Sequence, residues 1–161
     1  MAFDDLRELY QEVILDHGKH PRNFRHPPEA NRQARGDNPM CGDKITVYLT
    51  LAPSPSGEDV VADAAFEGRG CAISQASASL MTEMVRGKTV AQVRALFENF
   101  HDMCTKDDAL HGDHGDVDED AMDRLQVLSG VRQFPMRVKC ATLAWHTLIA
   151  AVDGGAKTST E

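Results

Sequence analysis

The sequence lacks the features that mark membrane, secreted and nucleic-acid-binding proteins. No apolar run approaches the roughly 20 residues of a membrane-spanning helix. The first residues, MAFDD, do not resemble a signal peptide. Basic residues are outnumbered by acidic ones, 17 to 25, whereas phosphate contacts need clustered Lys and Arg. We therefore expect a cytoplasmic protein with no membrane span and no nucleic-acid partner.

Cysteine is also scarce, with 4 among 161 residues. In a reducing compartment, metal binding or catalysis is a better explanation of these thiols than two disulfides. The length predicts a single domain over residues 1–161, long enough to bury a sizeable core. A hydrophobic content of 42% excludes disorder throughout the chain.

The net charge of −8 is concentrated in one segment, residues 102–123, because the acidic and basic residues outside it balance. We interpret this segment as an acidic surface insertion. It is not an EF-hand: counted from Asp116, the sixth position is Ala121 instead of Gly, and the twelfth is Val127 instead of Glu. A solvated surface that aids solubility or steers a partner is the remaining interpretation.

Hydrophobic periodicity and turn residues predict a mixed set of helices and strands. The chain begins with an amphipathic helix that Asp4 or Asp5 can cap, and it ends in a frayed polar tail. Between them we expect the following elements: a loop over 18–37 with a short edge strand before Gly36, a hairpin of strands 44–51 and 60–67, a helix over 72–86, a helix capped by Thr89, a helix over 118–128 broken at Ser129-Gly130, and a helix over 140–152.

Three cysteines lie where we expect elements to begin or end. Cys41 and Asp43 flank Gly42 in a Pro/Gly-punctuated turn, and extended backbone there would point both side chains the same way. Cys71 follows a Gly-x-Gly turn, and Cys140 opens an apolar run. Spacing alone leaves two interpretations, a shared metal site or ordinary loop and core residues, because C-x-D is not a standard zinc pair.

Three motifs then identify a resemblance. N-P-x-C-G-D, G-x-G-C-A-I-S-x-A-S-A-S and R-V-K-C-A-T-L-A-W occur in this order. Together they resemble the SufU branch of the IscU/NifU-type iron–sulfur assembly proteins, over nearly the whole chain. The resemblance implies an α+β fold: a small antiparallel sheet with helices packed on one face and a metal site at one end.

The resemblance also implies the chemistry of the site. Three thiolates and one carboxylate suit tetrahedral zinc, so the implied ligands are Cys41, Asp43, Cys71 and Cys140. The implied function is a zinc-dependent sulfurtransferase, which accepts persulfide sulfur from a SufS-type cysteine desulfurase and passes it to downstream iron–sulfur assembly proteins. In this mechanism the desulfurase docks, one of its side chains takes a zinc position, and the released Cys41 thiolate attacks the persulfide.

Two other functions stay open at this stage. The same ligands can serve a scaffold on which an iron–sulfur cluster is assembled, and ligand type alone does not separate zinc from iron. A purely structural zinc domain is the third interpretation. The scaffold branch typically has His before the last cysteine, and the residue here is Lys139, which favours the sulfur carrier.

Two further residues carry alternative interpretations. Arg137 is either an ordinary solvated charge or a supporting residue that holds a sulfur species or Asp43. His101-x-x-Cys104 has the spacing of two ligands on one helical face, but Cys104 belongs to none of the three motifs. We therefore interpret Cys104 as a structural or incidental thiol.

Overall fold

The computed structural model describes residues 3–40, 42–105, 118–155 and 157–159. Its centre is a sheet in the order β3-β2-β1-β4, in which the first three strands pair antiparallel and β4 is parallel to β1. The strands are β1 (Arg32–Asn38), β2 (Asp43–Pro53), β3 (Asp59–Arg69) and β4 (Lys157–Ser159). In the described part of the chain, no helix is long and apolar enough to cross a membrane.

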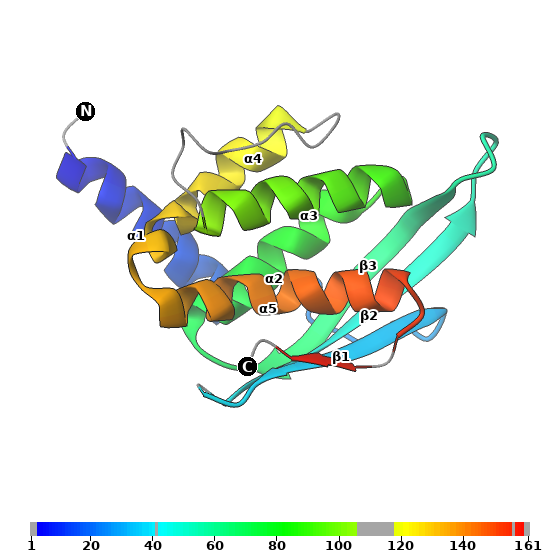
Figure 1. Cartoon of the computed structure of the whole chain (residues 1–161), viewed down its shortest axis with the longest axis horizontal. Helices are drawn as coiled ribbons and strands as arrows, with labels where there is room; N and C mark the ends of the chain where they lie inside the picture. Colours follow the sequence, from blue (N-terminus) through cyan, green and yellow to red (C-terminus); the bar gives the residue numbers. More distant parts are fainter. Residues whose placement is uncertain (1–2, 41, 106–117, 156, 160–161) are drawn as a thin grey trace.

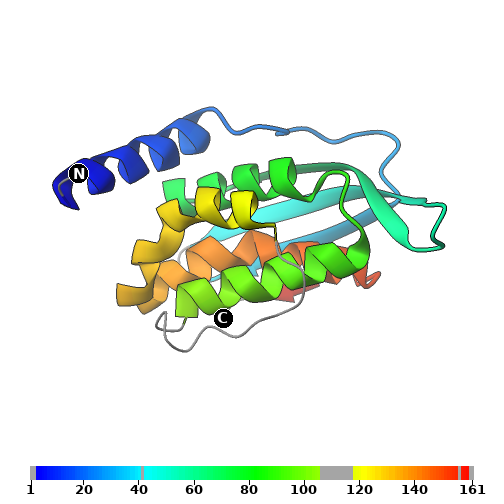
Figure 2. The same ribbon diagram turned by 90° about the horizontal axis from the view of Figure 1, so that it is seen from above.

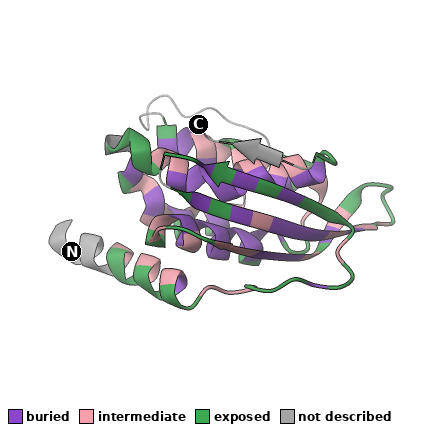
Figure 3. Ribbon diagram, turned by 90° about the horizontal axis from the view of Figure 1, so that it is seen from below, coloured by how far each residue is buried: buried purple, intermediate pink, exposed green. Residues whose placement is uncertain are grey.

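The helices gather on one face of this sheet (Figures 1 and 2). Their bounds are α1 (Phe3–Lys19), α2 (Ala72–Val85), α3 (Val90–Thr105), α4 (Glu119–Leu125), the 3-10 helix η2 (Gln126–Gln133) and α5 (Pro135–Val152). Helix α5 packs on β1 and β2 and also contacts α2 and α3. Along β1, buried residues that face the helices alternate with exposed residues that face away from them (Figure 3). The α+β fold predicted from the sequence is confirmed.

A buried polar contact fixes α2 against α5 within the apolar core. Trp145 and Ser77 are both fully buried. The indole Nε1 of Trp145 donates to Ser77 Oγ at 3.0 Å, and that hydroxyl donates to the carbonyl of Ala141. Phe100 of α3 stacks on Trp145 with 4.7 Å between the ring centroids. This contact holds in register the two helices that carry Cys71 and Cys140.

A second buried polar group, which we call the α1 anchor, ties the end of α1 to α2. It comprises His17, Arg22, Asn23, Ser79 and Thr82. His17 Nδ1 lies 2.7 Å from Ser79 Oγ, and the same hydroxyl accepts the backbone N–H of Arg22 at 2.8 Å. Asn23 Nδ2 donates to Thr82 Oγ1 at 3.1 Å, and that hydroxyl donates to the Ser79 carbonyl. Helix α1 is thus fastened by a set of mutually satisfied groups.

Several boundaries differ from the sequence predictions, each for a physical reason. Helix α1 already includes Asp4, so Asp4 and Asp5 lie inside it instead of capping it. The helix predicted to end at Ser129-Gly130 changes from α-helix to 3-10 helix after Leu125, and both residues lie inside η2. Helix α5 starts at Pro135, whose fixed φ suits the first turn of a helix, so Cys140 lies in the second turn.

The ends of the sheet also differ from the prediction. The edge strand expected before Gly36 runs through Gly36 to Asn38. The tail predicted as frayed contains β4, which pairs with residues 35–37 of β1. The predicted Thr89 cap is confirmed, because Thr89 Oγ1 accepts the N–H of Gln92 at 3.2 Å. In the acidic insertion, Asp118 caps α4 through the N–H of Ala121 at 3.0 Å; residues 106–117 lie outside the described part.

Candidate metal centre

Asp43 enters the site as the first residue of β2. The preceding Gly42 has φ +75°, a left-handed conformation that favours glycine, and its N–H closes the turn on the Asn38 carbonyl at 2.8 Å. The Asp43 carboxylate is only 1% exposed. Its Oδ1 accepts the backbone N–H of Cys71 at 3.0 Å, and its Oδ2 lies 4.0 Å from Cys71 Sγ.

Cys71 is the N-cap residue of α2, as its place before the helix-forming run predicted. Its extended backbone turns the chain into the helix, and its sulfur accepts the N–H of Ser74 at 3.5 Å. The approach to Asp43 requires glycine at position 70, since a Cβ there would lie 2.4 Å from Asp43 Oδ1. The absence of a side chain at Gly70 thus leaves room for the Asp43 carboxylate, and we call this close approach the Gly70 cradle.

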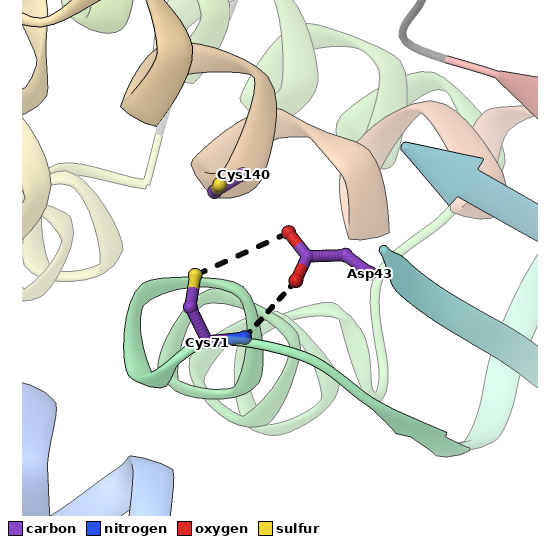
Figure 4. A group of neighbouring side chains, drawn as sticks. All are labelled: Asp43, Cys71 and Cys140. Carbon is purple, nitrogen blue, oxygen red and sulfur yellow. Dashed lines mark hydrogen bonds between the residues drawn. The ribbon is translucent and has the colours of Figure 1, made fainter. Parts of the chain in front are cut away.

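Cys140 completes the group from the opposite side. It is fully buried in α5. Figure 4 shows Asp43, Cys71 and Cys140 arriving from a strand and two helices, and one ligand atom from each lies within 4.8 Å of the others. Ligands of one tetrahedral zinc lie roughly 3.6–3.8 Å apart, given bonds of about 2.1–2.3 Å. A closure of about 1 Å therefore suffices, and the two sulfurs and the carboxylate fit zinc.

The surroundings of Cys140 favour the protonated form of its thiol. Burial raises the pKa of the Cys140 thiol, and so do its hydrogen bond to the Asp43 carboxylate and the proximity of Cys71. Charge interaction with Cys71 and a hydrogen bond to Cys140 raise the pKa of the Arg137 guanidinium. Arg137 is exposed, so a cationic side chain from the first turn of α5 borders the two sulfurs from the solvent side.

The structure thus brings together three of the four predicted ligands. The fourth, Cys41, lies outside the described residues, so its ligation stays a prediction. Cys104 is not in this group: it is fully buried in the apolar core on α3. Among the described residues, Asp43, Cys71 and Cys140 are the one His/Cys/Asp/Glu group with metal-ligand spacing.

Sequence reasoning missed two residues beside the ligands. Gly70 was noted as part of a motif, but its cradle role depends on a cross-chain approach to Asp43 that spacing does not reveal. Asn38 was predicted to start a turn, yet its side chain is fully buried, and within the described part of the chain neither its Oδ1 nor its Nδ2 has a hydrogen-bond partner. The available sequence signal was the alternation of Ala34, Gly36 and Asn38 with charged residues between them.

The outer face of the sheet carries a separate hollow of about 770 Å³ near the same end. Its lining includes Arg35, Lys44, Tyr48, Glu67 and Arg69. None of the three described ligands, Asp43, Cys71 and Cys140, lines it. The metal centre is therefore buried between sheet and helices and is not part of this open concavity.

The chain is similar in sequence to proteins of one known family. A family model described as the NifU-like N-terminal domain matches residues 9–141. The zinc-dependent sulfurtransferase SufU of Bacillus subtilis is 39% identical over 159 residues, covering 96% of this chain and 99% of the relative. The iron–sulfur cluster assembly scaffold protein IscU of Streptococcus pyogenes is 35% identical over 156 residues, covering 97% and 90%.

A solved structure agrees with these relatives. It is described as an iron–sulfur cluster assembly scaffold protein for the SUF system from Fervidobacterium islandicum, and it superposes with a TM-score of 0.72 at 32% identity. The match covers 91% of this chain and 98% of that one. Relatives with both kinds of described role therefore share this fold.

Proposed function

The chain belongs to the family of NifU-like N-terminal domains, and we propose that it acts in iron–sulfur cluster assembly as a zinc-dependent sulfur acceptor. The convergence of Asp43, Cys71 and Cys140 is the observation that carries this proposal. Together with Cys41 these residues would hold zinc. When bound, zinc keeps its cysteine ligands deprotonated, so that they are nucleophilic at neutral pH.

Cys41 is the proposed acceptor among the three cysteines. Cys140 is fully buried in α5, and Cys71 caps α2 while its N–H is bonded to Asp43, so both are tied to packed helices. The residues beside Cys41, Met40 and Gly42, are exposed. The turn position of Cys41, outside the packed helices, thus favours it as the cysteine that is released, and the desulfurase side chain that replaces it would keep the site closed.

The transfer itself is a thiol–disulfide type of exchange. The Cys41 thiolate attacks the outer sulfur of the persulfide carried by a cysteine desulfurase. A new S–S bond forms on Cys41, the sulfur–sulfur bond of the donor breaks, and the enzyme's cysteine leaves as a thiolate. Arg137 beside the other two sulfurs would attract the anionic persulfide and hold it during the exchange.

Mass spectrometry after incubation with a cysteine desulfurase and cysteine tests the acceptor. We expect an adduct of about 32 Da per sulfur atom on the Cys41 peptide. Cys41→Ala should abolish stimulation of the desulfurase even in molecules that retain zinc. An adduct confined to Cys71 or Cys140 would rule out this mechanism.

A cluster-assembly scaffold is the second candidate, favoured by the 35% identity to a relative described as IscU. In that case iron and sulfide should yield a stable cluster that transfers to an acceptor protein, without a sulfur adduct on Cys41. Metal analysis of protein purified without added metal separates the two. Near-stoichiometric zinc supports the sulfur acceptor, and bound iron with sulfide supports the scaffold.

A further inference from the structure

Asn38 carries a buried amide next to the candidate metal centre. It is 0% exposed, and neither its Oδ1 nor its Nδ2 has a hydrogen-bond partner among the residues that the structure describes. Nearly all buried polar side chains in proteins have at least one partner, because an unpaired one loses its hydration without compensation. An apolar residue would fit this core position at lower cost, so the amide calls for a functional explanation.

The register of the sheet places Asn38 directly across from Asp43. The two residues are Cα partners at the end of the β1–β2 ladder. Both occupy buried positions in strands whose burial alternates, so both side chains lie on the helix-covered face. Directly opposed side chains on one face lie within contact distance of each other. The unpaired amide is therefore a neighbour of the one carboxylate in the metal centre.

The Asp43 carboxylate already contacts Cys71. Its Oδ1 accepts the backbone N–H of Cys71 at 3.0 Å, and its Oδ2 lies 4.0 Å from Cys71 Sγ. A carboxylate accepts about four hydrogen bonds, so Asp43 has acceptor capacity left for the neighbouring Asn38 amide.

A carboxylate that ligates a metal is itself usually oriented by a hydrogen bond from a neighbouring group. Among the described residues, Asn38 Nδ2 is a buried donor without an acceptor, and it lies on the same face of the sheet as Asp43. We propose that Asn38 Nδ2–H donates to the Asp43 carboxylate in the metal-bound protein and so positions it as a ligand. This role rests on the metal site proposed above and assigns to Asn38 the orienting hydrogen bond that a ligating carboxylate requires.

Asn38→Leu tests the role, because leucine has the same number and branching of side-chain heavy atoms and no donor. We expect the melting temperature of the metal-free protein, measured in chelator, to stay the same or rise, because an unpaired amide has been removed. Zinc affinity, measured by competition with a chromophoric chelator, should fall about 10- to 100-fold. The cobalt-substituted protein should show altered ligand-field bands. Asn38→Ser, which retains a donor, should lose less affinity than Asn38→Leu.

Thr147→Val is the matched control. Thr147 is fully buried on α5 where it faces β1 at Gly36, but its hydroxyl already donates to the Leu143 carbonyl at 2.7 Å. Its loss should lower the melting temperature and leave zinc affinity unchanged. Loss of zinc affinity without loss of stability in Asn38→Leu, and the reverse in Thr147→Val, would distinguish a role in metal binding from a structural role.

A double-mutant cycle of zinc affinity with Asp43→Ala tests whether Asn38 acts through the Asp43 carboxylate. If the hydrogen bond goes to Asp43, Asn38→Leu should have no further effect on zinc affinity in the Asp43→Ala background. A full effect in that background would overturn the assignment, and so would unchanged zinc affinity in Asn38→Leu while the wild type binds zinc tightly. Absence of zinc binding by the wild type would instead overturn the proposed function, and this role with it.

Discussion

Two of the buried polar groups of the protein differ in completeness. In the α1 anchor, His17, Ser79 and Thr82 each have a hydrogen-bond partner within the protein. In the candidate metal centre, two thiols and one carboxylate lie beside the Asn38 amide, which has no hydrogen-bond partner among the described residues. Burial lowers the pKa of His17, which keeps it neutral, and raises the pKa of Cys140, which keeps it protonated.

We infer that the buried polar groups of the α1 anchor stabilise the fold, whereas those of the candidate metal centre are arranged for metal binding. A buried network with all its partners supports structure and specifies one packing. An incomplete network is costly on its own, and its groups become satisfied only when something is added. Variants in the two regions should therefore differ in which measurement they change, stability or metal affinity.

The largest effect is expected from removing a sulfur ligand. Cys71→Ser and Cys140→Ser should lose stoichiometric metal, because each takes away one of the converging thiols. They should also lose the stabilisation that metal provides, about 4 kcal/mol when free zinc exceeds its Kd a thousandfold. Metal analysis and melting temperatures with and without zinc measure both. Retention of zinc in either variant would remove that residue from the site.

A change in the α1 anchor should affect stability alone. Ser79→Ala leaves both His17 Nδ1 and the Arg22 N–H without their shared partner. We expect a loss of roughly 2–3 kcal/mol in the free energy of unfolding for two groups left unpaired. Urea unfolding in chelator measures it. Zinc affinity should stay at the wild-type value, and a parallel fall in affinity would mean that the two regions are coupled.

Gly70→Ala should disturb the candidate metal centre without replacing a ligand. The new Cβ would lie 2.4 Å from Asp43 Oδ1, so the carboxylate must shift. We expect a 10- to 100-fold loss of zinc affinity, the range seen when groups that orient metal ligands are disturbed. Gly130→Ala is the control, since a Cβ there meets no atom within 4 Å. Equal zinc affinity in the two variants would show that the cradle is not needed.

The pH dependence of stability should report the buried histidines. Burial lowers the pKa of His17 and of His146 below 6.5, so their unfolded forms bind protons first as the pH falls. Stability is fully present above about pH 6.5 and declines below it, by at most about 1.4 kcal/mol per pH unit for each histidine. Urea unfolding of the metal-free protein between pH 7.5 and 5.5 measures this slope. His17→Gln should flatten it, and an unchanged slope would exclude His17 as a source.

Cys104→Ser should have the smallest effect on the site. Cys104 lies in the apolar core away from the three converging ligands, so metal content and sulfur transfer should stay close to wild type. Zinc stoichiometry and the desulfurase stimulation assay measure both. Loss of zinc in this variant would show that the ligand assignment is wrong.

The local sequence pattern correctly predicted those elements that are determined by residues close together in the chain. The hairpin of β2 and β3 and the Thr89 cap follow from alternation and capping chemistry, and both were confirmed. β4 was missed because three polar residues carry no strand signal of their own, and their pairing comes from β1. The start of α5 was missed because the prediction followed the apolar run that opens at Cys140 and did not use Pro135 as a first helical residue.

The sequence predicted the residues of the candidate metal site better than it predicted the residues around them. The motifs pointed to Asp43, Cys71 and Cys140, and the structure places their ligand atoms together. The partnerless state of Asn38 and the cradle at Gly70 depend on segments that meet only in the folded chain. Metal ligation by the four predicted residues stays a prediction.

The position of Cys140 on α5 also has a consequence for biosynthesis. At about 5–20 residues per second, a ribosome takes roughly 3–14 s to extend the chain from residue 71 to residue 140. During that interval the nascent chain carries Asp43 and Cys71 but not the helix that closes the group. We expect a half-formed site to hold metal weakly, so metal loading should follow translation of α5 and should depend on the metal available to the finished protein.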